Sequence, residues 1–140
     1  MDYLFRQHYT VRQPAPLSAA PSVLLAESEP EALALYARHL SEANLLVNVC
    51  LDLNRLLTNI NEVQPHLLII NPAPDLAGTI ASLRQVAASY PGLPIISIGA
   101  PVPDPFLDRL MATGVALHIN RTLSQPRDIA VAARQILGLT

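Results

Sequence analysis

Short apolar runs and segments with helical spacing alternate along most of this chain. The apolar runs, which are rich in Leu, Ile and Val, predict strands at 22–26, 45–51, 66–71, 94–100 and 115–120. Helices are predicted between and after them, at 29–44, 52–64, 79–90, 104–113 and 128–139. The segment 72–78 contains two prolines and a glycine, so it is predicted to be a loop.

The predicted helices carry the signals of real helix faces and ends. In the first helix, Leu33, Tyr36 and Leu40 fall on one side, which is the spacing of a face that packs on a core. Asp52 is placed to cap the start of the second helix, and Pro65 stops that helix. These signals support the alternation of strand and helix.

Such alternation predicts a single α/β domain in which a parallel sheet has helices on both faces. The run 66–71 is the most continuous apolar segment and should be the central strand. Sites in sheets of this kind lie at the carboxyl ends of the strands. The polar or small residues at these ends are Glu27, Ser28, Asn71, Gly99 and Arg121.

Residues 1–21 differ from the remainder, and we assign the globular domain to residues 22–140. Pro14, Pro16 and Pro21 interrupt any regular element in this N-terminal tail. Tyr3, Phe5 and Tyr9 are half of the Phe and Tyr residues of the chain, an unusual density for a disordered segment. Two interpretations stay open, a poorly ordered terminus and a segment that docks on this domain or a neighbour.

Composition excludes several classes of protein. Hydrophobic residues make up 51% of the chain and charged residues 14%, as expected of a folded globular domain. The only cysteine, Cys50, excludes an internal disulfide and is interpreted as a small buried hydrophobe. Signal-peptide and membrane-span patterns are absent, so we expect a cytoplasmic protein. The net charge of −2 argues against a nucleic-acid surface.

The sequence offers few groups for catalysis or for a cofactor. Its four histidines have no metal-ligand spacing, and His66 and His118 are interpreted as structural. A Gly-rich phosphate loop and a Ser/His/Asp arrangement are both missing. We therefore expect no metal, no cofactor and no enzymatic activity.

Four motifs in register resemble response-regulator receiver domains of the CheY type. They are VLLAESEPEAL at the first strand, QPHLLIIN at the third, LPIISIGA at the fourth and MATGVALHINRT at the fifth. The resemblance covers roughly residues 22–139. It implies a flavodoxin-like, doubly wound (βα)5 sheet with strand order 2-1-3-4-5.

The departures from the family pattern fall on the phosphorylation pocket. By resemblance, Glu27 and Ser28 take the places of an acidic pair, Asn71 that of the phosphoacceptor Asp, and Gly99 that of a Thr or Ser. Arg121 stands where the family has Lys. An amide lacks the nucleophilicity of a carboxylate, and Mg²⁺ prefers carboxylate oxygens. The pocket is thus predicted to be degenerate and unable to accept a phosphoryl group.

Three hypotheses follow from this resemblance. The first is a pseudo-receiver of bacterial signalling that acts as a phosphorylation-independent interaction or dimerisation module. The second is the regulatory domain of a longer regulator, controlled by a ligand or by atypical phosphorylation. Separately, Asp75 in the loop after the third strand is a candidate substitute acceptor. The third is a small enzyme that uses the same crevice. Within the pocket, we expect Arg121 to contact Glu27 or the carbonyl of Asn71 without a metal.

The resemblance also implies a partner surface on the fourth helix, the fifth strand and the fifth helix. We place it at 104–113, 115–120 and 128–137, where it would bind a protein partner or a second copy of the chain. The charges that could pair across a two-fold axis there are Arg109, Arg127 and Arg134 with Asp104, Asp108 and Asp128.

Overall fold

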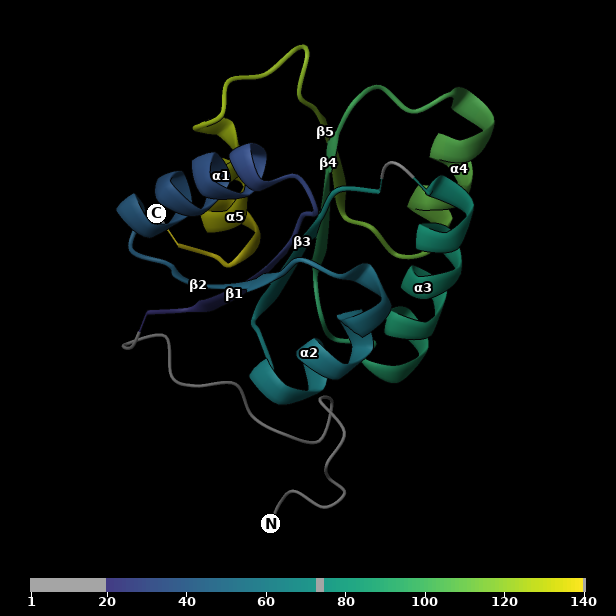
Figure 1. Ribbon diagram of the computed structural model, residues 1–140, viewed down its shortest axis with the longest axis horizontal. Helices are drawn as coiled ribbons and strands as arrows, with labels where there is room; N and C mark the ends of the chain where they lie inside the picture. Colours follow the sequence, from purple (N-terminus) through teal and green to yellow (C-terminus); the bar gives the residue numbers. More distant parts are fainter. Residues whose placement is uncertain (1–19, 73–74, 140) are drawn as a thin grey trace.

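A computed structural model describes residues 20–72 and 75–139. These residues form a five-stranded parallel sheet with helices on both faces (Figure 1). The strands are β1 (Ser22–Ala26), β2 (Leu46–Cys50), β3 (Leu67–Ile70), β4 (Ile95–Gly99) and β5 (Leu117–Asn120). Their order is β2-β1-β3-β4-β5, which confirms the predicted topology and the central position of the third strand.

Two layers of helices cover the sheet. The helices are α1 (Pro30–Glu42), α2 (Leu56–Val63) with the preceding 3₁₀ turn η2 (Leu53–Arg55), α3 (Leu76–Ser89), α4 (Asp104–Ala112) and α5 (Asp128–Ile136). Figure 1 shows α1 and α5 on one face and α2, α3 and α4 on the other. No helix in the described part of the chain is both long and apolar enough to cross a bilayer.

The central strand β3 divides the core into two clusters. Leu68 and Ile70 pack in the cluster beneath α2, α3 and α4, whereas Leu67 and Ile69 pack in the cluster beneath α1 and α5. All four side chains are 0% exposed. A strand buried on both faces must be continuously apolar, which is why this run gave the clearest strand signal in the sequence.

Side-chain caps fix the beginnings of several helical segments. The carboxylate of Glu29 accepts from the backbone N–H of Ala32 at 3.3 Å, at the start of α1. Asp52 caps as predicted, but the segment it begins is the 3₁₀ turn η2, from which α2 continues. These carboxylates satisfy backbone N–H groups that have no partner within the helix.

The prediction of a loop at 72–78 is partly wrong, because α3 already begins at Leu76. Asp75 is the residue that sets this start, since its Oδ1 accepts from the N–H of Gly78 at 3.0 Å. An N-terminal cap of this kind offsets the low helix propensity of glycine in the first turn. Residues 73 and 74 of the predicted loop lie outside the described residues.

The last strand is shorter than predicted. Pairing between β4 and β5 begins at Ile96 and Leu117, so residues 115 and 116 precede the strand. Val115 is nevertheless buried, which explains why its apolar side chain reads as part of the strand pattern.

The N-terminal tail was assigned to residues 1–21, and residues 1–19 of it lie outside the described residues. The division between tail and domain stays a prediction. Pro21 is buried against the domain, and its carbonyl accepts from the N–H of Leu46 at 2.8 Å.

Candidate functional site

The ends of β1 and β3 bring Glu27 and Asn71 side by side. Glu27 continues β1 and donates its backbone N–H to the carbonyl of Cys50 at 3.1 Å. Asn71 continues β3 and donates its backbone N–H to the carbonyl of Ala26 at 3.0 Å. Both side chains are buried at the carboxyl edge of the sheet, where the sequence predicted a site.

The two side chains bind each other directly. Nδ2 of Asn71 donates to Oε1 of Glu27 at 3.1 Å and to Oε2 at 3.2 Å. The backbone N–H of Glu29 also donates to Oε2, at 3.1 Å. A carboxylate only accepts hydrogen bonds, so the amide of Asn71 must turn its NH₂ group towards Glu27. The carboxylate, only 2% exposed, is thereby satisfied by protein groups alone.

Gly99, at the end of β4, provides the space that Asn71 needs. A Cβ atom at Gly99 would lie 2.5 Å from Oδ1 and 3.2 Å from Cγ of Asn71. Real Cβ atoms do not approach other atoms so closely, and the Asn71 amide is held by Glu27. Gly99 therefore belongs to the same structural unit as the Glu27–Asn71 pair, although it contributes no side chain.

Arg121 does not make the contact that the sequence predicted. Its backbone N–H donates to the carbonyl of Gly99 at 2.9 Å, which places it at the same edge of the sheet. Among the described residues, however, its exposed side chain forms no hydrogen bond with Glu27 or Asn71. Instead the charge of its guanidinium acts on the hydroxyl of Tyr36, a buried residue of α1, and lowers the pKa of that hydroxyl. The Arg121 cation therefore lies on the side of α1 and is not paired with Glu27.

Tyr36 is a polar residue near this edge that the sequence analysis did not identify as part of the site. Burial raises the pKa of its hydroxyl above the ordinary value, the charge of Arg121 lowers that pKa, and the charge of Glu27 raises it. Tyr36 and Arg121 also line a recess of about 30 Å³ with Ser124 and Gln125. The sequence analysis placed Tyr36 only on the apolar face of its helix. A single tyrosine among aliphatic residues was the one signal that could have indicated a polar role there.

Two other candidates do not join the cluster. Ser28 is exposed in the turn after β1. Asp75 is exposed and its carboxylate caps α3, so the proposed substitute acceptor already has a structural role. Among the residues that the structure describes, no three His, Cys, Asp or Glu side chains are grouped as metal ligands.

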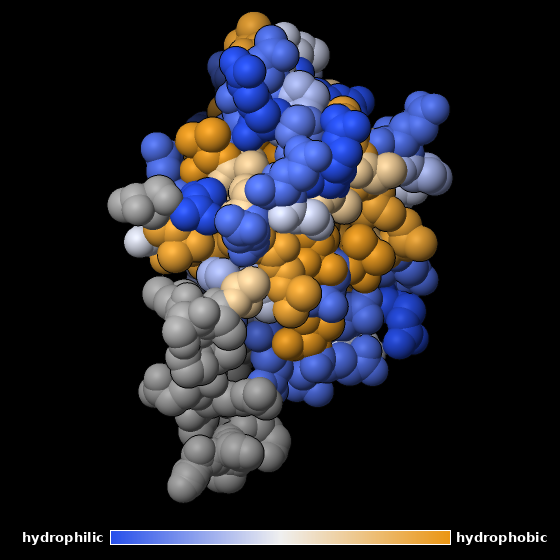
Figure 2. Space-filling view, turned by 90° about the vertical axis from the view of Figure 1, so that its left-hand side faces the viewer, coloured by the Kyte–Doolittle hydropathy of each residue, from blue (hydrophilic) through white to orange (hydrophobic). Residues whose placement is uncertain are grey.

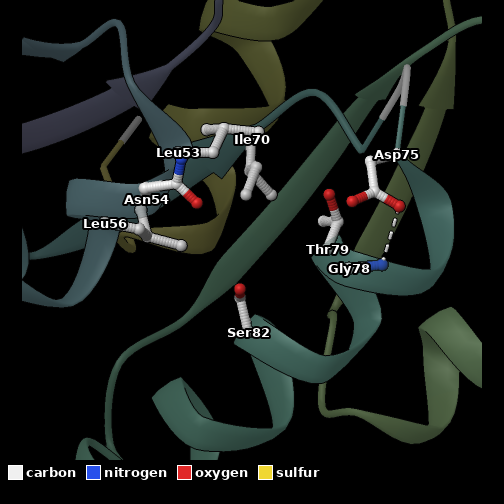
Figure 3. Close-up of a pocket in the computed structure, with 8 residues that line it drawn as sticks. All are labelled: Leu53, Asn54, Leu56, Ile70, Asp75, Gly78, Thr79 and Ser82. Carbon is white, nitrogen blue, oxygen red and sulfur yellow. Dashed lines mark hydrogen bonds between the residues drawn. The ribbon is translucent and has the colours of Figure 1, made fainter.

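A cavity of about 100 Å³ lies beside this cluster, between η2 and the first turns of α3 (Figure 3). Asn54, Asp75 and Ser82 contribute polar groups to its wall, and Ile70 and Leu56 contribute apolar ones. Its volume suits a few water molecules rather than a metabolite. Figure 3 shows the carboxylate of Asp75 bonded to Gly78, so it serves the helix terminus.

A second buried polar pair links β4 to β5. Oγ of Ser97 and Nδ1 of His118 lie 2.7 Å apart, and the two residues are register partners. Nε2 of His118 is buried without a well-aligned hydrogen-bond partner among the described residues. Burial lowers the pKa of His118 below its ordinary value, and the nearby carbonyl of Ala100 acts in the opposite direction. The sequence predicted a structural histidine, which agrees with this bond between neighbouring strands, and the lowered pKa favours its neutral form.

No family model matches this chain. No curated protein matches it either. Solved structures do match, and all of those described below are under 25% identical to this chain.

The similar structures are receiver domains and a protein of pilus assembly. A CheY-like response-regulator receiver domain from Methanospirillum hungatei has a TM-score of 0.77 at 16% identity, covering 86% of this chain and 95% of its own. A response regulator from Thermotoga maritima has a TM-score of 0.75 at 11% identity, covering 85% and 98%. A protein described as a pilus assembly protein (CpaE) from Burkholderia thailandensis has a TM-score of 0.73 at 19% identity, covering 84% and 98%. The domain therefore has the receiver fold.

Replacing Gly99 by Ala tests the coupling between Gly99 and Asn71. The added methyl group would collide with the Asn71 amide, and we expect the free energy of unfolding to fall by about 1–3 kcal/mol in urea denaturation. Gly92→Ala is the matched control, since a Cβ there meets nothing within 4 Å, and its effect should stay within about 0.5 kcal/mol. The penalty should shrink in an Asn71→Ala background; an equal penalty in both backgrounds would disprove the coupling.

The neutral His118 predicts a pH dependence of stability. Its pKa is lowered in the folded state, whereas in the unfolded chain it titrates near the ordinary value of about 6.5. The unfolded state then binds more protons, so stability is fully present above about pH 6.5 and falls as the pH drops below it. Urea titrations between about pH 8 and pH 5 should show a smaller loss for His118→Gln than for the wild type. If the free energy of unfolding fell equally with pH in both proteins, His118 would not be the cause of the loss.

Proposed function

We propose that this domain is a receiver-type module that works without phosphorylation and acts by binding another protein. The observation that carries the proposal is the Asn71–Glu27 pair at the carboxyl edge of the sheet. Asn71 occupies the end of the third strand, and its amide is committed to the one buried carboxylate beside it. The module is proposed to be non-enzymatic and cytoplasmic.

The chemistry of the pocket supports this proposal. Phosphoryl transfer to a side chain needs a nucleophile, and an amide lacks the reactivity of a carboxylate. Glu27 is 2% exposed and accepts three hydrogen bonds, so an attacking position is blocked on both of its oxygens. Gly99 has no hydroxyl that could follow a phosphoryl group. Arg121 is exposed, and its charge acts on the hydroxyl of Tyr36.

The proposed interaction surface consists of α4, β5 and α5. Each of these elements exposes one large apolar side chain: Met111 is 39% exposed, Leu117 38% and Val131 53%. Asp108, Arg109 and Arg127 are exposed charges on or beside the two helices. Exposed ion pairs contribute only about 0–1 kcal/mol each, so the apolar side chains would supply most of the affinity.

Two of the arginines assigned to this surface have intramolecular contacts. Nη1 of Arg134 donates to the carbonyl of Ala43 at 2.8 Å and so ties α5 to the end of α1. The guanidinium of Arg109 lies over the ring of Phe106, 5.3 Å from its centroid. We therefore retain Arg109 and Arg127 as contact residues for a partner and give Arg134 a structural role.

The likeness to the CpaE protein favours an assembly setting for the module. That protein is described as a pilus assembly protein, and it has the same fold over nearly all of its own chain. We propose that the present domain serves a comparable machine by contact, instead of relaying a phosphoryl group. The second candidate, a regulatory domain of a longer response regulator, is favoured by the likeness to the Thermotoga maritima regulator.

Incubation with acetyl phosphate and Mg²⁺ should leave the intact mass unchanged. We expect the same for Asn71→Asp, because Ser28 and Gly99 still lack the acid and the hydroxyl, and because the new carboxylate would face Glu27. Intact-mass spectrometry makes the measurement, with an active receiver domain as the positive control. A phosphorylated peptide containing Glu27, Asn71 or Asp75 would overturn the proposal.

Self-association is the simplest form of the proposed contact and can be measured by light scattering over a wide concentration range. We expect a dimer that is weakened by Leu117→Asp and by Val131→Asp, because each places a charge on the α4–β5–α5 surface. Leu46→Asp is the control, since Leu46 is also exposed but lies on the opposite edge strand. A monomer at every concentration would remove the dimer and leave only a different protein as the partner.

A further inference from the structure

The outer edge of β2 combines free strand-pairing capacity with exposed apolar side chains. Among the described residues, β2 pairs only with β1, so its other edge has no strand partner. Leu46 is 58% exposed, Val49 48% and Leu51 56%. Figure 2 shows apolar residues gathered over this side of the molecule, with hydrophilic residues around them. We call these three residues and the outer edge of β2 the β2 surface.

The exposed side chains lie on both faces of the strand. Val49 is the register partner of Leu25, which packs in the cluster beneath α1 and α5, and Leu51 follows on the same face. Leu46 lies on the opposite face with Asn48, whose partner Leu24 packs beneath α2 and α3. A flat partner would cover only one face, whereas an added strand places side chains on both.

Nothing in the strand itself discourages such an addition. Natural edge strands are usually protected by charged residues, proline or bulges. The sequence of β2, LVNVC, contains no charged residue and no proline, and the strand pairs with β1 in unbroken register. The β2 surface is therefore suited to an extended segment.

The N-terminal tail contains a segment with the pattern of a strand. Residues 3–11 read YLFRQHYTV, which is rich in aromatic and β-branched residues. With the period of two of an extended chain, Tyr3, Phe5, Tyr9 and Val11 share one face, and Arg6 falls on the other. Prolines begin only at Pro14, after this segment.

The point where the tail joins the domain brings this segment within reach. The carbonyl of Pro21 accepts from the N–H of Leu46, so the chain enters the sheet next to the start of β2. Residues 12–20 form the connection and can span about 30 Å, whereas two strand spacings amount to about 10 Å. The shortest connection joins a strand that ends near the start of β2, and such a strand runs antiparallel to β2.

The charges are complementary as well. The tail carries Arg6 and Arg12 against Asp2. Glu42 precedes β2 and Asp52 follows it, and both are exposed. The segment 22–75 as a whole has more acidic residues than arginines. A basic segment is thus favoured on this side of the molecule.

We propose that residues 3–11 bind to the β2 surface of their own chain as a sixth, antiparallel strand, with their aromatic face beside Val49 and Leu51. The inference goes beyond the proposed function and does not depend on it. It assigns the β2 edge to the tail and leaves the β5 edge for a partner.

The chain contains no tryptophan, which permits a clean fluorescence test in the full-length protein. Tyr9→Trp should give the blue-shifted emission of a packed side chain, independent of protein concentration. Adding Val49→Lys and Leu51→Lys should shift the emission to that of an exposed indole. Leu123→Lys is the matched control, because Leu123 is 85% exposed in the loop after β5 and should leave the emission unchanged. Circular dichroism verifies that each variant is folded.

Hydrogen exchange provides a second measurement that needs no change in β2. Phe5→Pro removes a pairing N–H and an aromatic contact from the tail. We expect it to accelerate exchange at β2 amides and to leave β5 amides unaffected. An exposed indole in the Tyr9→Trp protein, with β2 exchange unaffected by Phe5→Pro, would overturn the proposal. Blue-shifted emission that appears only at high concentration would also overturn it, since a second copy would then supply the strand.

Discussion

The buried carboxylate of Glu27 is the constraint that the carboxyl edge of the sheet depends on. A carboxylate that is almost inaccessible to water must have hydrogen-bond donors, because an unpaired buried charge is very costly. Asn71 and the backbone of Glu29 supply the donors here. The position of the Asn71 amide then requires Gly99, since a larger residue would occupy the same space. Glu27, Asn71 and Gly99, which look independent in the sequence, form one mutually dependent arrangement.

The fold was predictable because its main signals, the apolar runs of the strands and the spacing of the helix faces, lie within single segments of the sequence. β3 is buried on both faces, so it appears as a continuous apolar run, and β4 is interrupted only by Ser97. The alternation with helices then leaves a parallel sheet as the simplest topology. The edge of the site was predictable for the same reason, since the register of parallel strands brings residues such as Glu27 and Asn71 together whatever their side chains do.

Side-chain direction was the part that the sequence did not contain. The backbone places Arg121 beside Gly99, but a long arginine can reach either side of the sheet edge. Once Asn71 satisfies Glu27, the carboxylate has less need of a cation, and the charge of Arg121 acts on the hydroxyl of Tyr36 on the α1 side. The start of α3 was missed in a similar way, because Asp75 was considered as an acceptor of phosphate and not as a helix cap. In both cases the outcome depends on which of two polar partners a side chain takes.

A pocket satisfied by its own residues has consequences for how the domain could transmit information. In the proposed function, neither a metal nor a phosphoryl group changes the charge at the end of β3, so the pocket has no second state to adopt. The backbone bond from Arg121 to Gly99 joins the ends of β4 and β5. The Ser97–His118 pair joins the same two strands further down. Both bonds tie β5 to its neighbour in the sheet. In the proposed function, the affinity of the face made of α4, β5 and α5 would not depend on a chemical change in the pocket. Control would then have to come from elsewhere in the chain, and the β2 edge, next to the entry of the tail, is one of the two edges of the sheet that have no strand partner among the described residues.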